Sequence, residues 1–125
     1  MSSKLKSKIT SKDATIGIIG LGYVGLPLVI LFSEEGFRVI GFDIDETKVK
    51  KLNDSESYLK HIPSSAITDA ANNGFIATSD WRRISDCDAI LICVPTPLDS
   101  HKEPDLQFIR GTLDSIKPYL RADQL

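Results

Sequence analysis

A glycine-rich turn, Gly20-Leu-Gly-Tyr-Val-Gly25, directly follows the apolar residues 15–19 and precedes a segment with a helical pattern. In such a turn the first glycine allows a sharp bend, the second lets a pyrophosphate approach the backbone, and the third lets the helix pack closely. The first N–H groups of the helix, which have no partners inside it, then face the phosphates. The spacing therefore predicts a dinucleotide site at Gly20, Gly22 and Gly25.

An acidic residue ends the second apolar run, Gly41-Phe42-Asp43, at about the expected distance of 20 residues from the glycines. A carboxylate at this position accepts the hydroxyl groups of the adenosine ribose and would repel the 2′-phosphate of NADP. NAD is therefore the predicted cofactor. Lys48 follows shortly afterwards and has two interpretations: it reaches back to the ribose, or it is a solvated lysine on a helix.

The elements that must position these residues alternate between strand and helix patterns, which is typical of a parallel sheet with helices on its faces. Apolar runs predict strands over 15–20, 37–42, 75–78 and 89–94. Helices are predicted over 23–35, 45–53, 63–72 and 105–117, with a helical turn at 80–84. The expected fold class is α/β, a Rossmann-type doubly wound parallel sheet with strand order 3-2-1-4, truncated after about four strands.

The composition is that of one domain, because 125 residues of which 42% are hydrophobic bury a single core. We expect a domain over 15–125 and a mobile lead-in, or a loosely packed short helix, over 1–14. A net charge of −2 gives no basic surface for nucleic acid, and no apolar run approaches the roughly 18 residues that span a membrane. Two cysteines make neither a disulfide framework nor a metal site, which indicates a soluble protein of the reducing cytoplasm.

Three segments together resemble the UDP-glucose/GDP-mannose dehydrogenase family, and the resemblance runs from Thr15 to the C-terminus. They are the glycine turn with its continuation Leu-Pro-Leu, the acidic segment Asp43-Ile-Asp with Lys48-Val49, and Ile92-Cys-Val-Pro-Thr-Pro97. Within that family, Tyr58-Leu-Lys-His-Ile-Pro63 and Glu103-Pro-Asp105 are most similar to the UDP-N-acetylglucosamine 6-dehydrogenase subgroup.

This resemblance implies an enzyme that oxidises the C6 alcohol of a UDP-sugar to the uronic acid with two NAD. Family members hold the aldehyde stage on a cysteine in their middle part. The chain would then be an N-terminal NAD-binding fragment, inactive alone, of an enzyme that makes sugars for polysaccharides. The implied partner of the complete enzyme is a UDP-sugar, with no nucleic acid and no membrane, and the complete enzyme is expected to be a homo-oligomer.

Carried over by position, the family's cofactor contacts fall on three segments of this chain. Thr96 is the one candidate catalytic residue, near the nicotinamide and the reacting carbon, although its place between two prolines is also typical of a plain turn. The implied pyrophosphate contacts are Gly20, Gly22, Tyr23, Val24 and Gly25; the implied ribose contacts are Asp43 and Lys48; Val94, Pro95 and Thr96 follow the fourth strand.

Other reactive side chains fit packing roles better. Cys93 lies inside an apolar strand and has no histidine or cation nearby in the sequence to favour a thiolate, and both Cys93 and Cys87 are expected to be packing residues. Trp81 is expected to cover the core, and His61 to be structural. Two alternatives stay open. An NAD(H)-sensing regulatory module would carry the same glycine turn and acidic residue, and a flavin or S-adenosylmethionine site, the weaker choice, uses a related turn.

Overall fold

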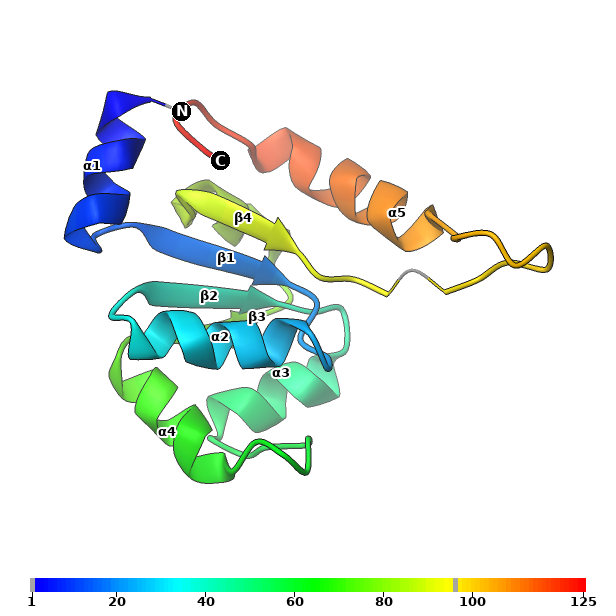
Figure 1. The fold of residues 1–125 in the computed structure, drawn as a ribbon, viewed down its shortest axis with the longest axis horizontal. Helices are drawn as coiled ribbons and strands as arrows, with labels where there is room; N and C mark the ends of the chain where they lie inside the picture. Colours follow the sequence, from blue (N-terminus) through cyan, green and yellow to red (C-terminus); the bar gives the residue numbers. More distant parts are fainter. Residues whose placement is uncertain (1, 96) are drawn as a thin grey trace.

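The computed structural model describes residues 2–95 and 97–125 and contains one parallel sheet with the order β3-β2-β1-β4 (Figure 1). Its strands are β1 (Thr15–Ile19), β2 (Arg38–Phe42), β3 (Ile76–Thr78) and β4 (Ala89–Ile92). The central strand β1 pairs with β2 on one side and with β4 on the other. The predicted fold class and strand order are thus confirmed.

The first and last strands end earlier than the sequence pattern predicts, and both ends have a local cause. β1 stops at Ile19 because Gly20 has a φ of 95°, which turns the chain away from the sheet. β4 stops at Ile92, although the Cys93 N–H still donates to the Ile19 carbonyl at 2.7 Å, because the chain then leaves through Pro95. Both strands therefore end at the same edge, where the glycine turn lies.

One face of the sheet is covered by α2 (Gly25–Glu34), α3 (Glu46–Asn53) and α4 (Ser64–Asn72). Asp45 caps α3 by accepting hydrogen bonds from the N–H groups of Thr47 and Lys48. Alternate strand residues face this layer and form the larger core, which includes Ile16, Ile18, Val39, Leu26, Val29, Leu52 and Ile67.

The opposite face carries η1 (Trp81–Asp86), α5 (Gln107–Ile116) and η2 (Lys117–Tyr119). The strand residues that point this way, Ile19, Ile40 and Phe42, pack against Ile84 and Ile116 in a second core cluster. Two layers of helices therefore enclose the sheet, and α5 lies beyond β4 (Figure 1).

The N-terminal segment contains α1 (Ser3–Ser11), in the region expected to be a mobile lead-in or a short helix. Its Leu5 is buried, and Lys8 Nζ lies 3.0 Å from a carboxylate oxygen of Asp88, at the start of β4. The helix is therefore tied to the sheet at this point, while the mobility of residues 1–14 stays a prediction.

The outer side of β4 is partly covered by the C-terminal residue. The Leu125 N–H donates to the Asp88 carbonyl at 2.9 Å, and the Ile90 N–H donates to the Leu125 carbonyl at 2.8 Å. Two bonds from one residue to positions 88 and 90 are the pattern of a parallel bridge.

Two kinds of feature are absent from residues 2–95 and 97–125. No helix there has both the length and the apolar character needed to cross a bilayer. No group of three or more His, Cys, Asp or Glu side chains there is arranged to hold a metal ion.

Candidate functional site

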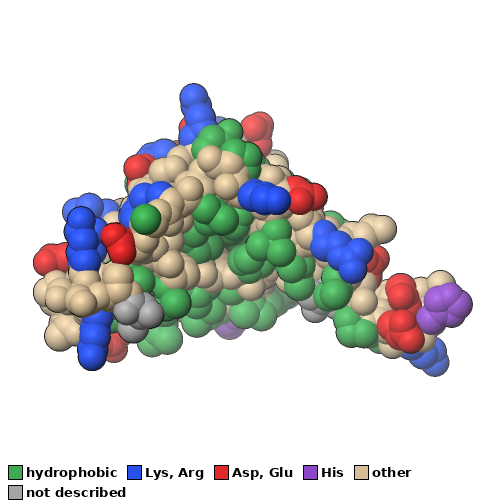
Figure 2. Space-filling view, turned by 90° about the horizontal axis from the view of Figure 1, so that it is seen from above, with side chains coloured by type: hydrophobic (Ala, Val, Ile, Leu, Met, Phe, Trp, Pro, Cys, Tyr) green, Lys and Arg blue, Asp and Glu red, His purple; other side chains and the backbone are tan. Residues whose placement is uncertain are grey.

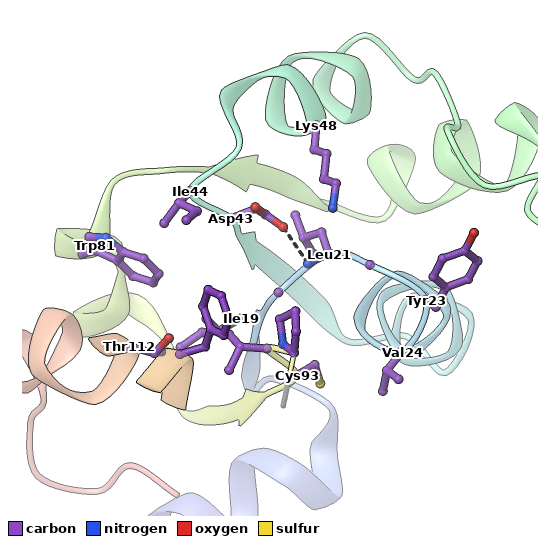
Figure 3. A pocket seen from close by; sticks show the side chains of 15 residues that line it. Ile19, Leu21, Tyr23, Val24, Asp43, Ile44, Lys48, Trp81, Cys93 and Thr112 are labelled. Carbon is purple, nitrogen blue, oxygen red and sulfur yellow. Dashed lines mark hydrogen bonds between the residues drawn. The ribbon is translucent and has the colours of Figure 1, made fainter. Parts of the chain in front are cut away.

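A cleft of about 560 Å³ opens at the carboxyl ends of β1, β2 and β4, where the order of the strands reverses (Figure 3). Open α/β sheets bind ligands at this place. Its walls come from the glycine turn, the end of β2, η1, the segment after β4, and α5. The lining residues are Ile19, Gly20, Leu21, Gly22, Tyr23, Val24, Asp43, Ile44, Lys48, Trp81, Cys93, Val94, Pro95, Phe108 and Thr112.

The three glycines of the turn have three different surroundings. A Cβ on Gly20 would lie 2.6 Å from the Cys93 carbonyl oxygen, and one on Gly25 would lie 1.7 Å from the Gly20 carbonyl oxygen. Among the described residues, a Cβ on Gly22 would meet no atom within 4 Å. Gly20 and Gly25 are therefore required by the fold itself, while Gly22 borders open space into which a ligand could come close to the backbone.

No side chain of residues 2–95 and 97–125 caps the start of α2. Val24 occupies the N-cap position without a side-chain hydrogen bond, and the first turn carries no acidic residue. Tyr23 and Val24 are largely exposed beside it. Helix N-terminal N–H groups and the positive end of the helix dipole attract anions, so this end suits a pyrophosphate.

The Asp43 carboxylate stands at the mouth of the cleft and holds the neighbouring backbone. One oxygen accepts the Leu21 N–H at 2.9 Å, the bond drawn in Figure 3, and the other accepts the Asp45 N–H at 2.9 Å. A carboxylate has about four acceptor positions. The remaining positions are available to the two hydroxyl groups of a ribose.

An apolar end of the cleft was not predicted from the sequence. Ile44, Trp81 and Thr112 lie on one side of Asp43 in Figure 3, and Tyr23 and Val24 lie on the other. The Trp81 ring also stacks on Phe42, with ring centres 5.9 Å apart and an angle of 6° between the ring planes. Trp81 is thus more than the core cover expected of it, and these walls suit a flat adenine ring.

The sequence contains a signal for one residue of this apolar end, Ile44, but not for another, Phe108. Ile44 directly follows Asp43, so a search of the residues next to the acidic position could have found it. Phe108 belongs to α5, far along the chain, and no sequence signal connects it with the glycine turn.

The segment after β4 supplies Cys93, Val94 and Pro95 to the cleft. Thr96, the predicted catalytic residue, lies outside the described residues. Cys93 packs against the larger core, as expected, but it is only partly buried and also lines the cleft, because the strand ends at Ile92. Burial raises the pKa of the Cys93 thiol and, together with nearby carboxylates, raises the pKa of Cys87 to about 12, so neither favours a thiolate.

Lys48 lines the cleft, as a ribose contact requires, and its Nζ lies 5.7 Å from the centre of the Tyr58 ring. The Tyr23 ring stacks on His61 at 6.2 Å between ring centres. Residues 58–61 therefore lie next to the glycine turn. The sequence links these two segments only through the family resemblance.

The comparisons with known proteins agree with this geometry. The model of the UDP-glucose/GDP-mannose dehydrogenase family, NAD binding domain, matches residues 14–125. Among solved structures, an NDP-N-acetyl-D-galactosaminuronic acid dehydrogenase from Methanosarcina mazei Go1 superposes with a TM-score of 0.80 at 30% identity, covering 100% of this chain and 29% of that protein.

Two curated relatives act on UDP-linked sugars according to their names. A UDP-N-acetyl-D-glucosamine 6-dehydrogenase from Pseudomonas aeruginosa is 32% identical over 91% of this chain and 26% of its own length. A UDP-N-acetyl-D-mannosamine dehydrogenase from Escherichia coli (strain K12) is 36% identical over 90% of this chain and 26% of its own length. The chain thus spans about a quarter of the length of these relatives.

Proposed function

Because the chain belongs to the UDP-glucose/GDP-mannose dehydrogenase family, we propose that it is the NAD-binding part of a nucleotide-sugar 6-dehydrogenase. The proposed reaction is the oxidation of the C6 alcohol of a UDP-sugar to the uronic acid. Removing two hydrides from a primary alcohol to give a carboxylate reduces two NAD and consumes one water, and the bound NAD supplies the hydride acceptor.

The arrangement of the glycine turn around Asp43 carries this proposal. Gly22 borders open space, the start of α2 has no side-chain cap, and Asp43 keeps free acceptor positions. The N–H groups at the start of α2 would hold the pyrophosphate, and Asp43 with Lys48 would hold the adenosine ribose. Ile44, Trp81 and Phe108 would enclose the adenine.

The cysteines of this chain do not suit the covalent step of the reaction. The elevated pKa values of Cys87 and Cys93 leave both thiols protonated near neutral pH. We therefore assign the nucleophile to another part of the complete enzyme. The chain alone is expected to bind NAD without oxidising a sugar.

UDP-N-acetylglucosamine is the substrate we propose, supported by the segment Tyr58–Pro63 and by the Pseudomonas aeruginosa relative. UDP-N-acetylmannosamine is the second candidate, because the Escherichia coli relative named for it is 36% identical. Membership of a dehydrogenase family weighs against the NAD(H)-sensing regulatory module.

The single tryptophan offers a direct test of cofactor binding, since Trp81 lines the cleft. NADH should quench its fluorescence, and NADPH should bind more weakly. Asp43→Ala should weaken NADH by about 10- to 100-fold, because hydrogen bonds to a charged group contribute about 1.5–3 kcal/mol. The same substitution should weaken NADPH less, since it also removes a repulsion from the 2′-phosphate.

Asp69→Ala is the matched control, because Asp69 is an exposed carboxylate on α4 and does not line the cleft. It should leave both titrations unchanged. Alkylation of the partly exposed Cys93, measured by mass spectrometry, should also slow when NADH is present. No quenching at millimolar NADH, or tighter binding of NADPH than of NADH, would count against the proposed function.

A further inference from the structure

The side chain of Tyr58 reaches the glycine turn from the connection between α3 and α4. Its hydroxyl donates a hydrogen bond to the Leu21 carbonyl, and its ring lies beneath the Lys48 ammonium. Tyr58 is not a neighbour of the turn in the sequence, since it lies 37 positions after Leu21.

The side chain, the N–H and the carbonyl of Leu21 are each held by a contact. Its side chain is fully buried, and a Cβ on Gly41 would lie 2.8 Å from a Leu21 methyl group. Its N–H donates to Asp43, and its carbonyl accepts from Tyr58. The hydrogen bond from Tyr58 therefore holds the Leu21 carbonyl, and its removal leaves the contacts of the Leu21 N–H and side chain in place.

The bond from Tyr58 controls the direction of the next N–H group. In a planar trans peptide the carbonyl of one residue and the N–H of the next point in opposite directions. The Leu21 carbonyl and the Gly22 N–H belong to the same peptide unit. Because the carbonyl points toward Tyr58, the Gly22 N–H points away from Tyr58. Among the described residues the Gly22 N–H has no hydrogen-bond partner, and Gly22 lines the cleft.

The hydroxyl remains a donor over the whole working range of pH. Burial, and to a smaller degree the carboxylates of Asp43 and Asp45, raises the pKa of Tyr58 above its ordinary value. A protonated phenol can donate to a carbonyl, whereas a phenolate cannot.

We infer that Tyr58 is a positioning residue: by holding the Leu21 carbonyl, it aims the Gly22 N–H at the pyrophosphate of the bound cofactor. This inference rests on the proposed function. It assigns part of the affinity for phosphate to a side chain that does not line the cleft.

Tyr58→Phe tests the inference, because phenylalanine keeps the ring beneath Lys48 and removes only the hydroxyl. Binding of ADP-ribose, followed by Trp81 fluorescence or calorimetry, should weaken about tenfold, the value of one hydrogen bond to a charged group. Binding of adenosine, which lacks the pyrophosphate, should change less than about twofold. Tyr119→Phe removes the same group from η2, away from the cleft, and should change neither.

The readout is the ratio of the two affinities, which a general loosening of the fold would not change. Equal weakening of ADP-ribose and adenosine by Tyr58→Phe, or no weakening of either, would overturn the inference while leaving the proposed function intact. Failure of the unsubstituted chain to bind ADP-ribose and NADH would instead overturn the proposed function. Thermal unfolding of each variant establishes that the compared proteins are folded.

Discussion

At the scale of single residues, two glycines of the turn have different roles: Gly25 is required by the fold, and Gly22 is required by the ligand. The space around Gly25 is filled by the Gly20 carbonyl, so any side chain there displaces α2 from the turn. No residue that the structure describes fills the space around Gly22, and its φ lies outside the left-handed region. A methyl group at Gly22 is therefore compatible with the fold but occupies the room of a phosphate.

Alanine substitutions at these two positions should both weaken NADH binding but should differ in their effect on stability. Gly22→Ala should keep its thermal midpoint within a few degrees and lose NADH affinity by more than about tenfold, because the pyrophosphate can no longer approach the backbone. Gly25→Ala should lose several degrees of thermal stability as well as NADH binding, since the clash is with backbone. Differential scanning fluorimetry and NADH titration measure the two effects.

Gly111 supplies the control, because it lies in the middle of α5 and a Cβ added to it would meet nothing within 4 Å. Gly111→Ala should stabilise the helix by about 1 kcal/mol and leave NADH binding unchanged. Loss of stability by Gly22→Ala as large as that of Gly25→Ala would contradict the distinction between the two sites.

At the scale of elements, Asp88 joins three parts of the chain at the end of the sheet away from the cleft. Its buried carboxylate accepts hydrogen bonds from the Thr15 N–H at 2.8 Å, Lys8 Nζ at 3.0 Å and Arg121 at 3.0 Å. Burial alone would raise the pKa of Asp88, but these bonds outweigh it and lower the pKa below its usual value. The helix α1, strand β1 and the C-terminal segment therefore depend on one charge.

The stability contributed by Asp88 should depend on pH with a defined sign. Because the folded pKa lies below the unfolded value of about 3.9, the contribution is complete above that value and is lost as the pH falls through the folded pKa. Asp88→Asn should cost about 2–4 kcal/mol at pH 7. The difference from the unsubstituted chain should shrink below about pH 4 in urea titrations.

Asp54→Asn is the matched control, because Asp54 forms an exposed ion pair with Lys50 at 3.3 Å along α3. It should cost less than about 0.5 kcal/mol. A pH-independent cost of Asp88→Asn, equal at pH 7 and at pH 3, would show that the carboxylate charge is not what stabilises this junction.

At the scale of the whole molecule, β4 forms an edge of the sheet. Leu125 pairs with its first half only, and an apolar groove of about 310 Å³ runs between this edge and α5. Its lining includes Ile90, Ile92, Leu113 and Leu120. Figure 2 shows hydrophobic side chains gathered in the middle of the face seen from above, with charged groups at both ends and along its upper margin.

We expect this chain to self-associate through the β4 edge at high concentration, because unpaired strand groups beside apolar surface are a template for a second strand. Light scattering after size exclusion should show a mass that rises with concentration. Ile92→Lys should suppress the rise, since a charge on the edge strand opposes pairing, and Ile76→Lys on β3 at the opposite edge is the control. A constant monomer mass, with fast amide exchange along Ala89–Ile92, would contradict this expectation.

Much of this protein was determined by local sequence. The glycine spacing, the acidic residue after the second apolar run and the alternation of patterns are local signals, and they predicted the fold class, the strand order and the NAD cofactor. Strand and helix propensities act over a few residues, so they can be read without the fold. Strand ends were less accurate, because the apolar pattern continues to Gly20 and to Val94, whereas the strands themselves end at Ile19 and Ile92.

Only the tertiary structure decided which distant side chains meet at the cleft. Trp81 and Phe108 reach it because η1 and α5 pack on the same face of the sheet, and Tyr58 reaches Leu21 because the connection before α4 folds back over the turn. Asp88 likewise gathers Lys8 and Arg121 from the two ends of the chain. Such contacts depend on how whole layers pack, and no periodicity within one segment of sequence encodes them.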